Sequence, residues 1–138
     1  SQEPAPAPVP ARLRLLAAVD NKTIQLVFAK MLSGLDIDLL FADDGQDAVE
    51  KFRELRPDIV FTDISMPRMD GKEAARQIRA MALELGLPHV PIVAMTAHAL
   101  DGDAESILAA GIDHYLTKPI RKSDLLARLA ALDHGRIL

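Results

Sequence analysis

Five short apolar runs alternate strictly with segments of helical spacing, and this alternation limits the fold more than any other feature of the sequence. The runs are largely continuous in apolar residues, which is typical of parallel strands covered on both faces. Right-handed crossovers place the intervening helices on both faces of such a sheet. The pattern therefore predicts an α/β fold, a (βα)5 doubly wound parallel sheet. The runs cover residues 13–20, 37–43, 58–63, 91–96 and 113–119.

Apolar stripes between the runs predict five helices. Spacing of three or four residues puts each stripe on one helical face, which we expect to pack in the core. Gly34, Gly86 and Gly111 stand where helices are expected to end, and Asp70 with Glu73 is typical of a helix start. The stripes are Ile24, Val27, Phe28, Met31 and Leu32; Val49, Phe52 and Leu55; Ile78, Met81 and Leu85; Ala104, Ile107 and Leu108; and Leu125, Leu126, Leu129 and Leu132.

Composition narrows the class of protein. The chain has 138 residues, 49% of them apolar, and a net charge of -4, which suits one domain with one core. A net charge this close to zero does not indicate a basic surface that binds nucleic acid or an anionic membrane. No apolar stretch approaches the roughly 18 residues that cross a bilayer. The absence of cysteine excludes disulfides and suits a reducing compartment, so we expect the cytoplasm.

The two ends of the chain differ from its middle. Residues 1–11, SQEPAPAPVPA, alternate proline with small residues, which is typical of an extended linker. We expect the folded domain to span residues 12–132 and a short tail to cover residues 133–138. The linker favours a preceding part of a longer protein, and we expect no output domain to follow.

The last polar residues of the five apolar runs are Asp20, Asp43, Asp63, Thr96 and Lys118. If the strand order is 2-1-3-4-5, Asp20, Asp63, Thr96 and Lys118 converge on one crevice at the carboxyl edge of the sheet. Each residue alone is commonly a turn former, a cap or a solvated loop residue. Two carboxylates about 4 Å apart repel by about 4 kcal/mol at an effective dielectric constant of 20, so they need a proton or a cation between them. Mg²⁺ prefers one or two carboxylates, waters and a phosphate oxygen, and an ammonium group and a hydroxyl suit further phosphoryl oxygens.

Four ordered motifs resemble those of the response regulator receiver domain of two-component signalling, over residues 12–132. This resemblance implies a flavodoxin-like fold with strand order 2-1-3-4-5. It implies that Asp63 takes a phosphoryl group from a phosphohistidine or a small acyl phosphate, and that Asp20, Asp63 and the backbone carbonyl of Ser65 bind Mg²⁺. The motifs are VDN at 19–21, DISMPRMDG at 63–71, MTAHA at 95–99 and GIDHYLTKP at 111–119.

The same resemblance assigns roles to the remaining site residues. It implies that Thr96 and Lys118 hold phosphoryl oxygens and that Tyr115 is the aromatic switch. Ser65 and His98 stand where the family tunes hydrolysis of the aspartyl phosphate. Output is expected on the surface of the fourth and fifth helices and the fifth strand, and the bond between Lys118 and Pro119 is commonly cis in the family.

Val19 departs from the family pattern, which usually has two neighbouring acids at the end of the first strand. Because Asp20 is kept, we expect Mg²⁺ binding to survive with weaker affinity. If Val19 abolishes metal binding, the chain is instead a docking module that needs no phosphate. An aspartate-nucleophile phosphohydrolase is a further alternative, but such enzymes typically need an acid where Ser65 stands.

The DISMPRMDG and TAHA forms resemble receivers of hybrid sensor histidine kinases. That resemblance implies a histidine kinase domain as donor and a histidine phosphotransfer domain as the next acceptor, with a stand-alone receiver as the alternative. The isolated domain is expected to catalyse only its own phosphorylation and dephosphorylation. Structural or solvated roles are expected for His89, His114 and His134, and a turn and cap for Asp43, Asp44 and Gly45.

Overall fold

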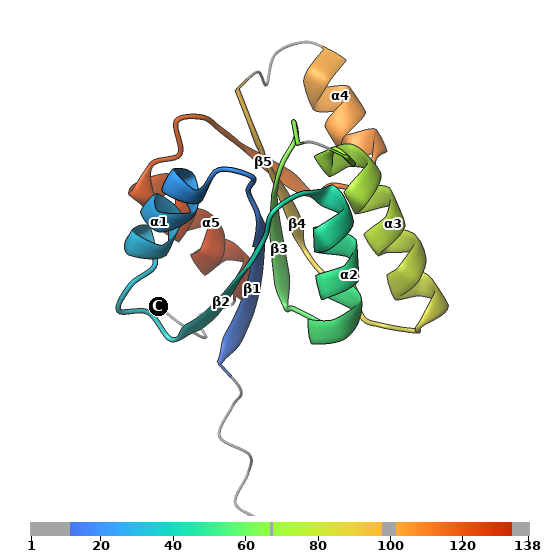
Figure 1. Ribbon diagram of the computed structural model, residues 1–138, viewed down its shortest axis with the longest axis horizontal. Helices are drawn as coiled ribbons and strands as arrows, with labels where there is room; N and C mark the ends of the chain where they lie inside the picture. The colour runs from blue at the N-terminus through green and yellow to red at the C-terminus, as the bar shows by residue number, and fades with distance from the viewer. Residues whose placement is uncertain (1–11, 67, 98–101, 134–138) are drawn as a thin grey trace, which may run out of the picture.

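The computed structural model describes residues 12–66, 68–97 and 102–133, in which five strands alternate with five helices (Figure 1). The strands are β1 (Leu13–Ala18), β2 (Ile37–Ala42), β3 (Ile59–Asp63), β4 (Ile92–Thr96) and β5 (His114–Thr117). The helices are α1 (Lys22–Met31), α2 (Gly45–Leu55), α3 (Gly71–Glu84), α4 (Gly102–Ala109) and α5 (Lys122–Asp133). None of these helices is both long enough and apolar enough to cross a lipid bilayer.

The sheet has the order β2-β1-β3-β4-β5, and every neighbouring pair is parallel. The predicted doubly wound topology is therefore confirmed. Each strand is one to three residues shorter than its apolar run, because the chain leaves the sheet to enter the turns. After β1, for example, the side chain of Asn21 accepts the N–H of Thr23 at 2.8 Å and caps α1.

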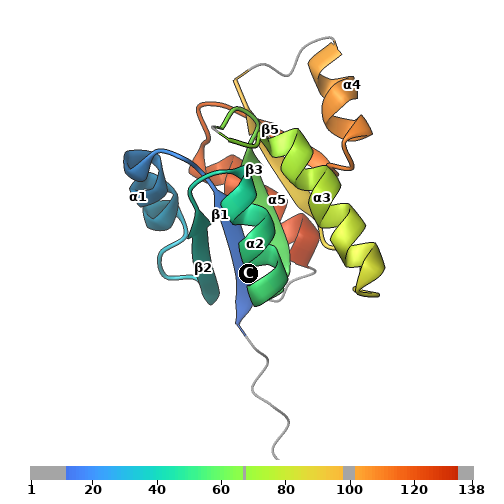
Figure 2. The ribbon, with the colours of Figure 1, turned by 45° about the vertical axis from the view of Figure 1, so that its right-hand side comes forward.

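Helices cover both faces of the sheet (Figures 1 and 2). On one face, α1 and α5 pack with alternate strand residues such as Leu15 and Phe61. On the other face, α2, α3 and α4 pack with the intervening residues, such as Leu16 and Val60. Since successive side chains along a strand point to opposite faces of the sheet, every second residue of a strand contacts the same set of helices.

Local signals account for the helix ends. Gly34, Gly86 and Gly111 have φ of 86°, 67° and 91°, the left-handed conformation that ends a helix. The carboxylate of Asp70 accepts the N–H of Glu73 at 2.9 Å and caps α3. These predicted helix ends and this predicted cap are confirmed.

The predicted core stripes are only partly correct. Phe28 of α1 is buried, but Ile24 and Val27 of the same stripe are 46% and 43% exposed. Leu85 and Leu108 are also exposed. The apolar stripe of α1 is wider than the sheet surface beneath it, so its outer side chains border a groove instead of the core.

Candidate functional site

The carboxyl ends of β1, β3, β4 and β5 lie along one edge of the sheet, at the top of Figure 1. Asp63 is the last residue of β3. Thr96 ends β4 in register with Thr117 of β5, and Lys118 follows directly. Asp20 lies two residues beyond the end of β1. The topology thus brings the four predicted residues to the same edge.

Asp63 forms an ion pair with Lys118 across this edge. The side chain of Asp63 is 6% exposed, whereas that of Lys118 is 41% exposed and enters from the solvent side. The backbone N–H of Lys118 donates to the carbonyl of Thr96 at 2.8 Å, which fixes where the lysine side chain begins. The ammonium group contacts the buried Oδ1 of Asp63, and both its charge and its hydrogen bond oppose the rise that burial causes in the pKa of that carboxyl.

The electrostatics at Asp63 favour a further cation. Burial raises the pKa of this carboxyl, the ion pair with Lys118 opposes the rise, and the negative charge of Asp20 adds to it. The net shift of the Asp63 pKa is upward. Asp20 itself is exposed in the turn before α1, close enough to Asp63 for their charges to interact.

Thr96 and Tyr115 belong to the opposite face of the sheet. Tyr115 pairs in register with Ala94 of β4 and packs, half-buried, against the core on the side of α2, α3 and α4. By strand alternation the buried Thr96 follows Ala94 on that same face. Asp63, by the same rule, follows Phe61 toward α1 and α5. The two predicted switch residues therefore share a face that the phosphoacceptor candidate does not.

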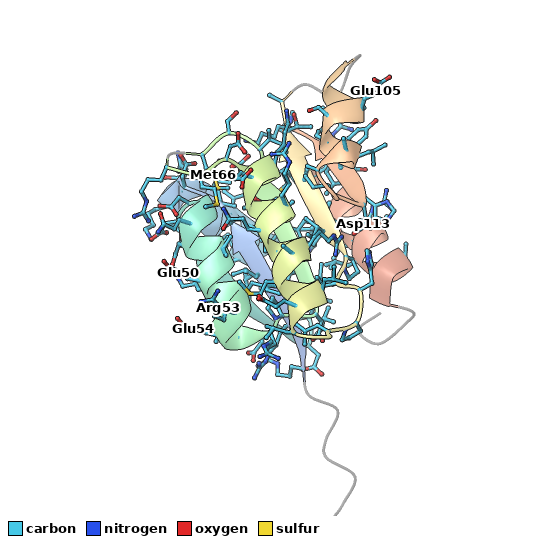
Figure 3. The ribbon with its side chains drawn as sticks, turned by 90° about the vertical axis from the view of Figure 1, so that its right-hand side faces the viewer. Glu50, Arg53, Glu54, Met66, Glu105 and Asp113 are labelled. Carbon is cyan, nitrogen blue, oxygen red and sulfur yellow. The ribbon has the colours of Figure 1, made fainter. Side chains whose placement is uncertain are left out.

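The loop between β3 and α3 is closed tightly behind Asp63. The carbonyl of Ile64 accepts the N–H of Gly71 at 2.9 Å. A Cβ on Gly71 would lie 2.1 Å from the carbonyl oxygen of Asp63, so the close approach requires glycine. Ser65 is exposed in this loop, and the next residue, Met66, packs partly buried near the start of α2 (Figure 3).

Val19 fills the position where the family usually has an acid. Its side chain is fully buried in the core with Phe28 and Phe61. Its carbonyl accepts the side-chain amide of Gln25 at 2.7 Å, and that amide also donates to Asp43 at 3.0 Å. The acidic content of the site is therefore reduced to Asp20 and Asp63.

A groove of about 460 Å³ opens beside Asp63, and no pattern in the sequence predicted it. One wall is the exposed side of α1, and the other is the loop that follows β5. Asp63 and Lys118 are the charged residues of an otherwise apolar lining. The lining residues of α1 and the β5–α5 loop are Ile24, Val27, Phe28, Met31, Pro119 and Ile120.

The residues at this edge fit Mg²⁺. The described residues contain no cluster of three or more His, Cys, Asp or Glu side chains suited to a metal ion. Mg²⁺ needs no such cluster, because it binds through one or two carboxylates and keeps several waters. Asp20 and Asp63, whose charges interact, would supply the carboxylates.

Several predicted residues fall outside this edge or outside the described ranges. His98 and His134 lie outside the described residues. His89 contacts Asp113 at 2.8 Å, and His114 begins β5 as expected. Asp44 caps α2, as predicted, by accepting the N–H of Asp47. The bond between Lys118 and Pro119 is cis, as the resemblance implied.

The chain is similar to known proteins over most of its length. The family model of the response regulator receiver domain matches residues 15–130. Sensor protein GacS of Pseudomonas syringae pv. syringae is 37% identical over 112 residues, which are 81% of this chain and 12% of that protein. Hybrid signal transduction histidine kinase I of Dictyostelium discoideum is 38% identical over 112 residues, 78% of this chain and 6% of that protein. The chain thus spans a small fraction of these relatives.

Two solved structures are similar along most of the chain. The receiver domain of sensor histidine kinase PA1611 from Pseudomonas aeruginosa, with a magnesium ion in its active-site cleft, is 35% identical. The TM-score is 0.80, and the match covers 91% of this chain and all of that one. The Saccharomyces cerevisiae Ssk1 receiver domain, crystallised with the histidine phosphotransfer protein Ypd1, is 29% identical with a TM-score of 0.84 and covers 93% of each chain. The chain belongs to the response regulator receiver domain family and is a receiver domain of two-component phosphorelay signalling.

Proposed function

We propose that Asp63 is the phosphoacceptor of this receiver domain. A carboxylate oxygen of Asp63 attacks the phosphorus of a phosphohistidine; the new O–P bond forms as the N–P bond breaks, and the histidine nitrogen keeps the electron pair. The observation that carries this proposal is the environment of Asp63. Its buried carboxylate ends a central strand, contacts an ammonium group, interacts with a second carboxylate and borders an open groove.

Phosphoryl transfer needs positioning and charge neutralisation more than covalent help from the protein. We propose that Asp20, Asp63 and the carbonyl of Ser65 hold Mg²⁺, which when bound neutralises charge on the transferring group. Lys118 then pairs with one phosphoryl oxygen, and the hydroxyl of Thr96 donates to another. The magnesium ion in the similar PA1611 receiver supports this assignment of the metal.

The groove beside Asp63 suits the partner that carries the phosphohistidine. Ile24 and Val27 expose apolar surface on its rim, although isolated receivers gain nothing from exposed apolar side chains. We propose that a helix of a histidine phosphotransfer or kinase domain lays its apolar face here and brings its histidine to Asp63. The complex of the similar Ssk1 receiver with Ypd1 supports a partner of this kind.

The wider protein is proposed to be a hybrid sensor histidine kinase. The chain matches short parts of long relatives, among them a hybrid kinase of Dictyostelium discoideum. In that setting Asp63 receives the phosphoryl group from a kinase histidine and passes it to a phosphotransfer domain. The cysteine-free composition agrees with the cytoplasm as the compartment.

Phosphorylation is proposed to act as a switch. The phosphoryl group adds about 1.5 to 2 negative charges, which draw Lys118 and the Thr96 hydroxyl inward. Thr96 and Tyr115 share a face of the sheet, so movement of one frees or fills space beside the other. The surface of α4, β5 and α5 then changes its shape for the next partner.

Intact mass measurement tests the central claim. The chain is incubated with acetyl phosphate, with and without Mg²⁺, beside the variant Asp63→Asn. The proposal expects a gain of one phosphoryl group that requires both the metal and Asp63. If the wild-type chain gains no mass under any condition, the chain is a docking module that needs no phosphate; a gain that persists in Asp63→Asn moves the acceptor elsewhere.

A further inference from the structure

The loop between β3 and α3 is fastened to the start of α2 by an ion pair. Nε and Nη2 of Arg68 lie 2.6 and 2.5 Å from the same carboxylate oxygen of Asp44. The side chain of Asp44 is 8% exposed, and its other oxygen accepts the N–H of Asp47 at 2.8 Å. Asp44 therefore does two things at once: it caps α2 and binds the arginine of a loop 24 residues away.

Main-chain contact reinforces the ion pair. The N–H of Gly45 donates to the carbonyl of Met69 at 3.1 Å. A Cβ on Gly45 would lie 2.1 Å from that carbonyl oxygen, so the start of α2 and the loop touch directly. Met69 is also partly buried against the core beside α2 and α3. The loop cannot shift far without breaking this contact.

Arg68 has a φ of 65°, which side chains other than glycine, asparagine and aspartate rarely adopt. A residue in such a conformation persists only where its surroundings hold it. The carboxylate of Asp44 is the group that holds the Arg68 side chain. The bond between Ile64 and Gly71 joins the two ends of the loop, and the ion pair of Arg68 with Asp44 anchors the loop between those ends. Ser65 lies between Ile64 and Arg68 in the chain.

We propose that Arg68 is a positioning residue: its ion pair with Asp44 holds the β3–α3 loop so that the Ser65 carbonyl stays in place for Mg²⁺. This inference rests on the proposed function of the site. Neither Arg68 nor Asp44 is assigned to the metal, and both act through the loop. Partners that orient metal ligands typically change metal affinity by about 10 to 100-fold when they are removed.

Two variants separate the ion pair from the other roles of its members. Asp44→Asn removes the charge but keeps a good capping side chain for α2. Arg68→Asn removes the ion pair but tolerates the positive φ, so it adds no backbone strain. Arg76→Gln is the matched control, because it breaks an exposed pair with Glu73 on neighbouring α3.

Two measurements are made on the full chain, its variants and the Asp44→Asn/Arg68→Asn double variant. Titration calorimetry gives the Mg²⁺ dissociation constant. Amide hydrogen exchange without metal measures how often the backbone of the β3–α3 loop opens to solvent. Each single variant is expected to weaken Mg²⁺ binding about tenfold, and the double variant no further, because both remove one interaction. Amide exchange at Ser65 and Met66 is expected to speed up in both single variants. Arg68→Lys is expected to keep part of the Mg²⁺ affinity that Arg68→Asn loses, and the control Arg76→Gln is expected to match wild type in both measurements.

The outcomes distinguish this inference from the function on which it rests. Wild type that binds no Mg²⁺ and takes no phosphoryl group overturns both. The positioning role alone is overturned if wild type binds Mg²⁺ and takes a phosphoryl group while the variants keep the Mg²⁺ affinity or the loop exchange rate of wild type. The positioning role is also overturned if the losses of Mg²⁺ affinity in the two single variants add up in the double variant, since additive losses show two independent effects.

Discussion

The ion pair between Asp63 and Lys118 joins a carboxylate that is 6% exposed to an ammonium group on a side chain that is 41% exposed. Because burial is the largest influence, the pKa of Asp63 is raised, and the folded state favours the protonated acid more than the unfolded state does. Stability is therefore lost as the pH rises through the window between the ordinary value of 3.8 and the raised pKa, and it stays lower above that window.

Asp63→Asn is accordingly expected to be more stable than wild type at pH 7, with Lys118 free to turn toward solvent. The difference in the free energy of unfolding shrinks as the pH falls from the raised pKa of Asp63 toward 3.8, and it is absent below 3.8. Urea unfolding at a series of pH values checks this, with the exposed Glu54→Gln as control. A stability gain that is the same at every pH would refute the buried-charge explanation.

Val27→Asp tests the groove as the docking surface for the phosphohistidine partner. Val27 lines the groove, whereas Leu26, its neighbour in α1, is 70% exposed and is not part of the lining. Transfer from a phosphorylated histidine phosphotransfer domain is expected to slow about 30-fold or more in Val27→Asp, which corresponds to the threshold of about 2 kcal/mol for an interface hot spot. The rate at which acetyl phosphate phosphorylates Val27→Asp is expected to fall far less, because this small donor does not need the groove.

Leu26→Asp is the control for this experiment, and its transfer rate is expected to stay close to that of wild type. Equal losses in the two variants would show a general effect of charge on α1 rather than contact in the groove.

Val19→Asp restores the acid that the family usually has at this position. Mg²⁺ affinity is expected to rise, since a further negative charge joins Asp20 and Asp63. Without metal the variant is expected to lose at least about 2 kcal/mol of stability at pH 7, because Val19 is fully buried among apolar side chains. Calorimetry and urea unfolding measure the two effects.

Val19→Asn separates charge from packing in that experiment. It loses the same apolar contacts but adds no charge, so its Mg²⁺ affinity stays at or below that of wild type. A similar affinity gain in both variants would mean that packing, not charge, limits the metal site.

Asp113→Asn tests an ion pair far from the candidate site. Asp113, which is labelled in Figure 3, accepts the N–H of Ile92 at 2.8 Å and pairs with Arg79 of α3 at 2.6 Å. Burial alone raises the pKa of Asp113, but these donors and His89 outweigh it and hold that pKa low. Its contribution to stability is therefore present above the ordinary pKa and lost as the pH falls through the lowered one.

Asp113→Asn is expected to lower the free energy of unfolding at pH 7 by about 2 kcal/mol, the size typical of hydrogen bonds to a charged group. This difference from wild type disappears in acid. Glu73→Gln breaks the exposed pair with Arg76 and is expected to cost less than about 0.5 kcal/mol. Urea unfolding measures both, and equal losses would mean that the Asp113 pair behaves as a surface pair.

Local sequence signals were enough to predict the strands, the helices and the doubly wound class of sheet, whereas the strand order was implied by the family resemblance. Continuous apolar runs identified the strands, and the glycines at 34, 86 and 111 identified helix ends, because each depends on a few neighbouring residues. The meeting of Asp63 with Lys118 was predictable for a related reason: both lie at strand ends, and parallel strands end at one edge.

Other features depend on distances that the sequence pattern does not contain. Periodicity told which residues of α1 share a face, but not how wide a surface that face meets, so the exposure of Ile24 and Val27 was missed. The pairing of Arg68 with Asp44 depends on the backbone conformation of the loop and joins residues far apart in the chain. Helical and strand patterns carry no signal for such contacts.

The sheet separates α1 and α5 from α2, α3 and α4 (Figure 2). Asp63 follows the first of these faces, whereas Tyr115 packs on the second. A protein seated over the groove beside α1 leaves the Tyr115 side uncovered. On the proposed function, a reader that contacts only α4 and the Tyr115 side leaves the groove open to the donor, whereas a reader that also covers α5 shares a face of the sheet with that groove.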